Sequence, residues 1–226
     1  MFSSGHTGIN TDEVGIVLQG PTVYVEPVVQ CYCRANNVLW STWEDEPEAN
    51  LKAIKESGIK LNLVKRPVHT GYWNINLQCL STYTGILELA KDPNLKCFVK
   101  IRSDIVIDDI ERFIEEVRSA LSQNPIAFLG YVDYEGGYLL DYIVAGSLSA
   151  MLSFWTPEIN SSSGYPAPEI WLQNRFFPLL RGANAIEVFS NHFPFIKLRG
   201  YTLYFHKRNT SINQIAASDK RYKVKE

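Results

Sequence analysis

The sequence predicts an α/β fold, a single domain with a mostly parallel central sheet, helices on both faces and a small mixed C-terminal elaboration. Short, continuously apolar runs recur through residues 14–131, as expected for strands that are buried on both faces. Segments with helical spacing of apolar residues separate these runs, and strict alternation of strand and helix is typical of parallel sheets. After about residue 132 the alternation stops, so we divide the domain at 14–131 and 132–226, after a loose start at 1–13.

The first elements follow this alternation. Residues 14–18 (VGIVL) form an apolar run that ends before Gly20-Pro21, and they predict the first strand. Proline suits the first turn of a helix, so Pro27 predicts a short helix over 27–35. Residues 38–43 (VLWSTW) predict the second strand.

Two further strand and helix pairs come next. Residues 48–57 predict a helix that ends at Gly58, and 61–65 predict the third strand. Residues 75–90 carry apolar side chains at helical spacing, and 97–101 predict the fourth strand.

The remaining elements are less regular. Asp108 and Glu111 form a plausible cap for a helix that ends near Leu121, and 126–131 predict a fifth strand. The later elements that we expect are a helix at 169–180 and strands at 185–189 and 201–206.

Composition excludes several classes of function. Of the 226 residues 46% are hydrophobic and 20% charged, and the formal net charge of −2 shows no basic surplus for nucleic acid. No apolar run approaches the roughly 20 residues of a membrane span, and the first residues do not form a signal peptide. The four cysteines lack zinc-site spacing and fit free thiols. We therefore expect a cytoplasmic protein.

Polar residues follow each predicted parallel strand, where an open α/β sheet binds its ligand. They are Gln19, Gly20 and Pro21 after the first strand, Glu44 and Asp45 after the second, 66–76 after the third and Arg102-Ser103-Asp104 after the fourth. The glycine would let a ligand approach the backbone, and the glutamine amide can pair with a base edge. Acidic residues after a second strand can bind a ribose or a base.

No glycine-rich phosphate loop is present, so a metal or cationic side chains must carry phosphate charge. Asp104 is an oxygen ligand suited to Mn²⁺ or Mg²⁺, and Arg102 can pair with phosphate through its planar fork. His206, which lies late in the chain, is a candidate to fold back as a second metal or phosphate ligand. Glu169 is the candidate general base at a helix start, with Asp133 and Asp141 as rivals.

Four segments, GIVLQGPT (15–22), LWSTWE (39–44), NINLQCLSTYTGILELA (74–90) and FVKIRSDI (98–105), resemble the WavE-type lipopolysaccharide-synthesis proteins. The pattern N-x-N-x-Q-x-x-S-T beginning at Asn74 is the most specific part. The resemblance implies a GT-A-like, Rossmann-like glycosyltransferase, which takes a sugar from a UDP- or GDP-sugar donor to a glycan acceptor, with inversion as an assumption. Leu77 stands where many relatives carry a basic residue, and the chain is shorter than typical members.

By motif, the resemblance implies that Gln19, Gly20 and Pro21 flank the base and that Glu44 or Asp45 contacts base or ribose. It further implies donor contacts from three residues of the following helix start, Asn74, Asn76 and Gln78. Asp104 becomes the metal ligand, Arg102 the partner of the diphosphate and Glu169 the base.

Two alternatives stay open. A non-catalytic nucleotide-sugar or glycan-binding module would explain the loss of the first aspartate from an Asp-x-Asp pattern at Arg102. A nucleotidyltransferase would use the same type of sheet edge and would release pyrophosphate from a nucleoside triphosphate.

Overall fold

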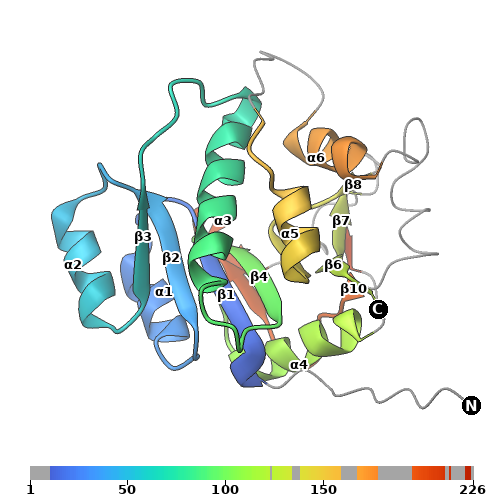
Figure 1. The fold of residues 1–226 in the computed structure, drawn as a ribbon. Coiled ribbons are helices and arrows are strands. Elements are labelled where there is room, and N and C mark those ends of the chain that lie inside the picture. The colour runs from blue at the N-terminus through green and yellow to red at the C-terminus, as the bar shows by residue number, and fades with distance from the viewer. Residues whose placement is uncertain are drawn as a thin grey trace, which may run out of the picture.

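The structure is a computed structural model (Figure 1). It describes residues 11–122, 124–133, 138–158, 167–177, 195–211, 214 and 222–224. The strand predicted at 185–189 lies outside these residues, as does the end of the helix predicted at 169–180. No helix in the described part of the chain is long and apolar enough to cross a membrane.

A seven-stranded sheet forms the centre of the molecule. Its order is β10-β6-β9-β4-β1-β2-β3, and only β9 runs antiparallel to its neighbours. The strands are β1 (Val14–Gln19), β2 (Val38–Trp43), β3 (Lys60–Val64), β4 (Cys97–Arg102), β6 (Ile126–Leu129), β9 (Ile143–Gly146) and β10 (Phe195–Ile196). Every residue of β1 and β2 is buried, which explains the unbroken apolar run 14–18 in β1 and the mainly apolar sequence of β2. The predicted α/β class with a mostly parallel sheet is therefore confirmed.

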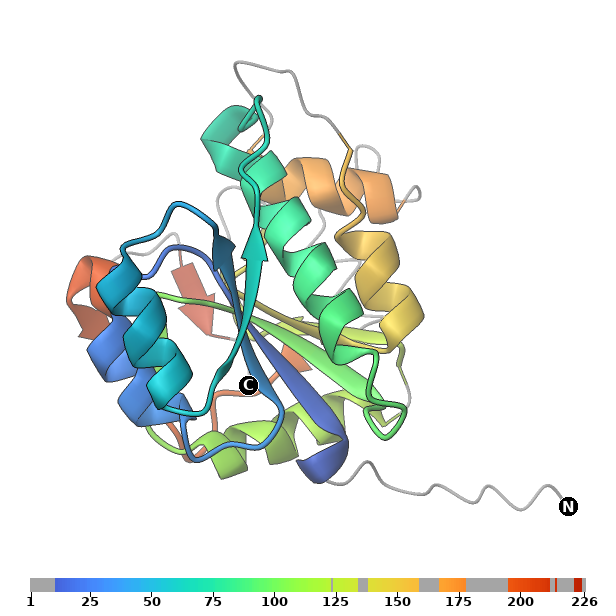
Figure 2. The same cartoon turned by 60° about the vertical axis from the view of Figure 1, so that its left-hand side comes forward.

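Helices cover both faces of this sheet. They are α1 (Val25–Tyr32), α2 (Glu48–Glu56), α3 (Ile75–Leu89), α4 (Ile110–Leu121), α5 (Leu148–Phe154) and α6 (Pro168–Phe176). Side chains of α1, α2 and α4 pack with Ile16 and Leu18 on one face, whereas α3, α5 and α6 pack with Val17 on the other. Figures 1 and 2 show α3 and α5 side by side on that second face.

Two small sheets complete the fold. One has the order β12-β11-β5, and the other has the order β13-β7-β8. Their strands are β5 (Ile105–Ile107), β7 (Tyr131–Asp133), β8 (Tyr138–Leu139), β11 (Leu203–Phe205), β12 (Thr210–Ser211) and β13 (Tyr222–Val224). Because Phe205 of β11 pairs with Ile105 of β5, the C-terminal part of the chain lies directly beside Asp104.

Three details of the predicted elements need correction. Helix α1 begins at Val25, so Pro27 lies within its first turn, where the missing N–H costs no helical hydrogen bond. Asp109, rather than Asp108, caps α4 by accepting a hydrogen bond from the backbone N–H of Arg112. Asp108 instead accepts the backbone N–H of Thr202 at 2.6 Å, because the β11 segment lies beside it.

Candidate functional site

A cavity of about 780 Å³ opens where the parallel strands β1, β2 and β4 end. Six of its lining residues come from the predicted ends of the first and fourth strands, namely Gln19, Gly20, Pro21, Arg102, Ser103 and Asp104. Three more lie at helix starts: Asn74 and Gln78 at α3, and Glu169 at α6. The rule that ligands bind beyond the carboxyl ends of parallel strands thus selects the residues that this cavity gathers.

The loop after β1 is fastened to the loop after β4. Ser103 donates its hydroxyl to the carbonyl of Pro21 at 2.9 Å, and its backbone N–H to the carbonyl of Gln19, also at 2.9 Å. Gly20 has φ +130°, and a Cβ atom there would lie 2.6 Å from Ser103 Oγ. The room left by the missing side chain of Gly20 is therefore occupied by Ser103 rather than kept open for a ligand.

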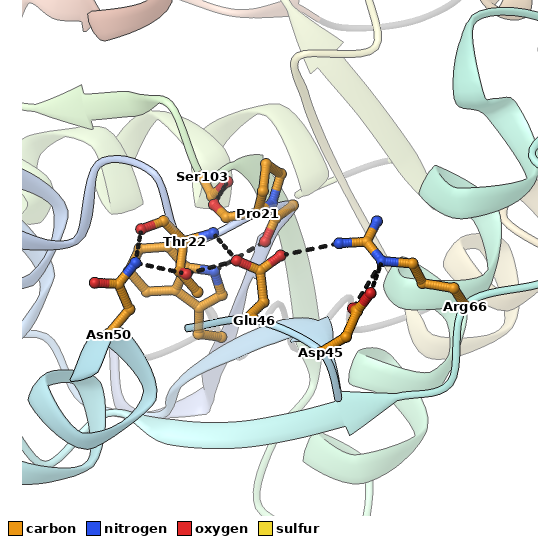
Figure 3. A network of polar contacts seen from close by, with 9 residues as sticks. Pro21, Thr22, Asp45, Glu46, Asn50, Arg66 and Ser103 are labelled. Carbon is orange, nitrogen blue, oxygen red and sulfur yellow. Dashed lines mark hydrogen bonds and ion pairs between the residues drawn. The ribbon is translucent and has the colours of Figure 1, made fainter. Parts of the chain in front are cut away.

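The acidic residues after β2 serve a structural network (Figure 3). Asp45 binds Nε of Arg66 with both oxygens, at 2.7 and 2.8 Å, and is exposed, as is Glu44. Glu46 accepts the backbone N–H and the hydroxyl of Thr22, at 3.0 and 2.6 Å, and contacts Arg66 Nη2 at 3.3 Å. Neither Glu44 nor Asp45 lines the cavity. Glu46, which we did not single out from sequence, holds the loop after β1 in place.

Asn76 also has a structural partner. Its side chain donates to the carbonyl of His69 at 3.0 Å, and this bond ties the loop before α3 to the first turn of the helix. Asn76 is buried and does not line the cavity, unlike Asn74 and Gln78. Two consecutive residues before the helix, Trp73 and Asn74, have left-handed backbone conformations with φ 48° and 63°. Such strain is often found at functional sites, and Trp73, 61% exposed, lines the cavity.

Arg102 and Asp104 bind one another. Nε of Arg102 lies 3.1 Å from Oδ1 of Asp104, and Nη2 lies 2.8 Å from Oδ2. The guanidinium also lies 4.9 Å from the ring centre of Tyr142 and 5.1 Å from that of Phe205. Burial acts to lower the pKa of Arg102, but the Asp104 and Asp141 carboxylates outweigh it and raise that pKa. The guanidinium is therefore a fixed positive charge at the end of β4.

The predicted metal ligands do not come together as a donor set. Both oxygens of Asp104 already face Arg102. The backbone N–H of His206 does reach the carbonyl of Asp104 at 2.8 Å, but its ring lies against Tyr24 and Tyr204, with centroids 5.5 and 4.9 Å away. Within the described ranges there is no group of three or more His, Cys, Asp or Glu residues that could hold a metal ion. These residues therefore do not fit a resident Mn²⁺ or Mg²⁺ ion held by Asp104 and His206.

Glu169 lies in the first turn of α6 with its Oε2 atom buried. Burial, followed by the charge of Asp141, raises the pKa of the Glu169 carboxyl to about 8. Lys100 is buried beside Asp141, with Nζ 4.0 Å from Asp141 Oδ2, and burial lowers the pKa of Lys100 to about 8. Of the two rivals for the role of base, Asp141 lines the cavity, while the side chain of Asp133 lies outside the described part.

Sequence reasoning missed several residues that line the cavity. They are Tyr24, Trp43, Lys207 and Arg208, whereas Arg66 and Trp73 belong to the segment 66–76 that was expected at the end of the third strand. The two basic residues directly follow His206 and could have been recognised as a pair of cations after a strand. The aromatic residues carried no such signal, because a buried core uses the same residue types.

A second hollow, of about 1160 Å³, lies between α1, β5 and α4. Its walls carry Asp108, Asp109, Glu111 and Glu115 together with Arg34. Although it is larger, it contains none of the predicted site residues and lies away from the ends of the parallel strands. We therefore take the cavity at the strand ends as the candidate functional site.

Comparison with known proteins adds only distant similarities. No family model matches the sequence, and no curated protein does, so the WavE-type resemblance stays a prediction. Among solved structures, 4-diphosphocytidyl-2C-methyl-D-erythritol synthase from Anaerococcus prevotii is 12% identical, with a TM-score of 0.48 over 74% of this chain and 84% of that one. A protein assigned as a glucose-1-phosphate thymidylyltransferase, from Bacillus anthracis, is 12% identical, with a TM-score of 0.44 over 79% and 78%.

A third structure, described as a mannose-1-phosphate geranyltransferase from Thermus thermophilus, is 13% identical, with a TM-score of 0.41 over 80% of this chain and 68% of that one. Because these TM-scores are low, we base neither the fold nor the function of this chain on the three similarities.

Proposed function

We propose that this chain is a glycosyltransferase that moves a sugar from a UDP- or GDP-sugar to a hydroxyl group of a glycan acceptor. The observation that carries the proposal is the composition of one cavity at the strand ends. It combines Arg102 and the basic pair Lys207 and Arg208 with Glu169, a carboxyl group of raised pKa. Cations suit a diphosphate, and a carboxyl group that titrates near neutral pH suits the deprotonation of a hydroxyl.

The nucleotide part of the donor would lie along the loop after β1. Gln19 offers an amide to a base edge, while Trp43 and Trp73 offer rings for stacking. The N-terminus of α3 begins at the same cavity, and the positive end of its dipole favours a phosphate nearby.

Arg102 can bind a diphosphate without releasing Asp104. A guanidinium has five N–H donors, and Asp104 accepts from Nε and Nη2 of Arg102. The remaining donors have no hydrogen-bond acceptor among the described residues. Asp104 thus acts as an orienting partner that holds the other edge of the guanidinium ready for phosphate oxygens.

In the proposed reaction, the acceptor oxygen forms a bond to the anomeric carbon as the bond from that carbon to the donor phosphate breaks. The acceptor proton passes to the Glu169 carboxylate, and the electron pair of the broken bond leaves with the nucleoside diphosphate. Arg102 and Lys207 stabilise the charge that develops on this leaving group. A single displacement of this type inverts the anomeric configuration.

Because the pKa of Glu169 is raised to about 8, the carboxylate form that accepts the proton becomes populated as the pH rises through that value. We expect kcat/KM to increase from pH 6.5 to pH 8.5. Since no resident metal fits the donor set, chelation with EDTA should leave nucleotide-sugar binding intact.

The experiment that tests the function measures release of UDP or GDP from a panel of nucleotide-sugars, with and without glycan acceptors. Glu169→Gln should lower transfer by about 10²- to 10⁴-fold and keep donor affinity. Glu56→Gln, an exposed carboxyl on α2, is the matched control and should behave as the wild type. Binding of nucleotide-sugars without transfer or hydrolysis would refute the enzyme and favour a binding module.

A nucleotidyltransferase is the second candidate, because the cavity is lined by four cations, Arg66, Arg102, Lys207 and Arg208, enough for a triphosphate together with a sugar phosphate. The products separate the two activities. Pyrophosphate released from UTP or GTP in the presence of a sugar 1-phosphate would replace the proposed function, whereas UDP or GDP released from the nucleotide-sugar supports it.

A further inference from the structure

Three buried oxygen atoms of the cavity accept no hydrogen bond in the described part of the chain. They are Gln78 Oε1, Asp141 Oδ2 and Glu169 Oε2, and all three residues line the cavity. They come from α3, from the turn between β8 and β9, and from α6, so three separate elements bring them together. Asp141 is only 2% exposed.

Such atoms are rare in folded proteins because a buried oxygen without a hydrogen-bond partner destabilises the fold. A single unpartnered oxygen could reflect local packing. Three such oxygens in residues that line one cavity indicate a site for a ligand that donates several hydrogen bonds, which the side chains would meet after a small rotation.

Lys100 shows that the missing ligand need not supply positive charge. Its side chain is completely buried, and Nζ donates to the carbonyl of Asp141 at 2.5 Å. The same Nζ atom lies 4.0 Å from Asp141 Oδ2 and 4.8 Å from the ring centre of Trp155. A buried lysine without a carboxylate beside it would be costly, so Lys100 and Asp141 balance one another.

This balance distinguishes between two kinds of ligand. A divalent cation would place further positive charge beside Lys100 and Arg102, which Coulomb repulsion in a partly buried site disfavours. A sugar ring carries several hydroxyl groups, each of which donates a hydrogen bond without adding charge. The amide of Gln78 can both accept from a hydroxyl and donate to it.

We infer that Asp141 and Gln78 form the subsite for the hydroxyl groups of the donor sugar, with Lys100 as the positioning residue that holds Asp141 in place. This inference rests on the proposed function and assigns specificity within it. Glu169 Oε2 then faces the acceptor hydroxyl on the same wall, which leaves the sugar bound between its hydroxyl partners and the proton acceptor.

The test compares the affinity for a nucleotide-sugar with that for the nucleotide alone, by calorimetric titration of UDP-glucose against UDP and GDP-mannose against GDP. Gln78→Met keeps the side-chain length and removes the hydrogen bonds; Asp141→Asn keeps the shape and removes the charge. For whichever pair binds the wild type, Gln78→Met should weaken the nucleotide-sugar about 5-fold and Asp141→Asn about 10- to 100-fold. Affinity for the nucleotide alone should stay within about twofold.

Gln30→Met, an exposed glutamine on α1, is the control for the substitution itself. Gln78→Met does not touch Lys100, so it keeps the test valid if Asp141→Asn disturbs folding. If the variants weaken the binding of nucleotide and nucleotide-sugar equally, or weaken neither, the sugar subsite is overturned. The proposed function still stands in that case if the wild type transfers sugar. If the wild type binds no nucleotide-sugar at all, the proposed function fails first and the subsite fails with it.

A thermal-shift titration with MnCl₂ alone tests whether a divalent cation binds to the three unpartnered oxygens. We expect MnCl₂ to change the melting temperature of the wild type and of Asp141→Asn by the same amount, because the three unpartnered oxygens do not form a metal site. A shift that Asp141→Asn abolishes would assign the three oxygens to a cation and overturn the inference.

Discussion

Replacement of Gly20 with alanine tests how firmly the loop after β1 depends on its contact with Ser103. Gly20 has φ +130°, a conformation that L side chains rarely adopt, and the new Cβ atom would lie 2.6 Å from Ser103 Oγ. That hydroxyl must then turn away and give up its 2.9 Å hydrogen bond to the carbonyl of Pro21. The substitution therefore combines backbone strain with a lost buried hydrogen bond.

The magnitude follows from the two contributions. Backbone strain of this kind costs about 1–3 kcal/mol. The lost hydrogen bond adds about 0.5–1.5 kcal/mol, so we expect Gly20→Ala to lower the free energy of unfolding by about 1.5–4.5 kcal/mol. Gly58 is the matched control, since its φ is +86° and a Cβ atom there would meet nothing within 4 Å. Gly58→Ala should cost only the left-handed conformation, about 1–2 kcal/mol.

The assay is urea unfolding of Gly20→Ala, Ser103→Ala and the double variant, analysed with a common m-value. Ser103→Ala alone should cost about 0.5–1.5 kcal/mol, but nothing further in the Gly20→Ala background, where the hydrogen bond is already gone. An equal cost of Ser103→Ala in both backgrounds would show that the two residues do not interact. A cost of Gly20→Ala no larger than that of Gly58→Ala would refute the steric argument.

Three further predictions concern carboxyl and thiol groups. Between pH 5 and pH 8, the folded protein keeps a proton on Glu169 that the unfolded chain releases, because burial raises the pKa of Glu169 from 4.5 to about 8. The free energy of unfolding of the wild type should therefore fall with rising pH relative to that of Glu169→Gln, as measured by urea unfolding at each pH. Glu46→Ala should lower the free energy of unfolding by about 1.5–3 kcal/mol, because Thr22 and Arg66 lose their acceptor, whereas the exposed Glu44→Ala should not change it. In native protein only the exposed Cys33 should react quickly with a thiol reagent at pH 8. Burial raises the pKa of the other three thiols, those of Cys31, Cys79 and Cys97, to about 11 or 12. Rapid labelling of more than one thiol would contradict this prediction.

Strands β1, β2 and β4 were predictable because they are almost completely buried. The continuous apolar run 14–18 marks β1, and Gly58 marks the end of α2. Strand β9 and helix α5 were missed, since the segments 143–146 and 148–154 are short and follow a break in the alternation. Strand β5 was read as part of the charged segment before α4 because it has only three residues.

The site was predictable only where position in the sheet decided it. The loop after β1 and the Arg102-Ser103-Asp104 segment follow central strands, so their backbone had to reach the cavity. Whether an acidic side chain then points to the cavity depends on the neighbours it finds. Arg66 lies more than twenty positions from Asp45 in sequence, and its attraction for Asp45 and Glu46 could not be read from either segment alone.

The presence of Arg102 rather than an acidic residue determines what the end of β4 can do. Lys100 and Arg102 are two positions apart on β4; Arg102 lines the cavity, while the side chain of Lys100 is completely buried. The first is fixed by Asp141, and the second by Asp104 and by the rings of Tyr142 and Phe205. A metal ion must be recruited from solution and held against exchange, whereas these two charges are part of the folded strand. In the proposed transfer Arg102 would be a charge of this kind, because stabilisation of a leaving group is strongest when the charge is already in place before the reaction.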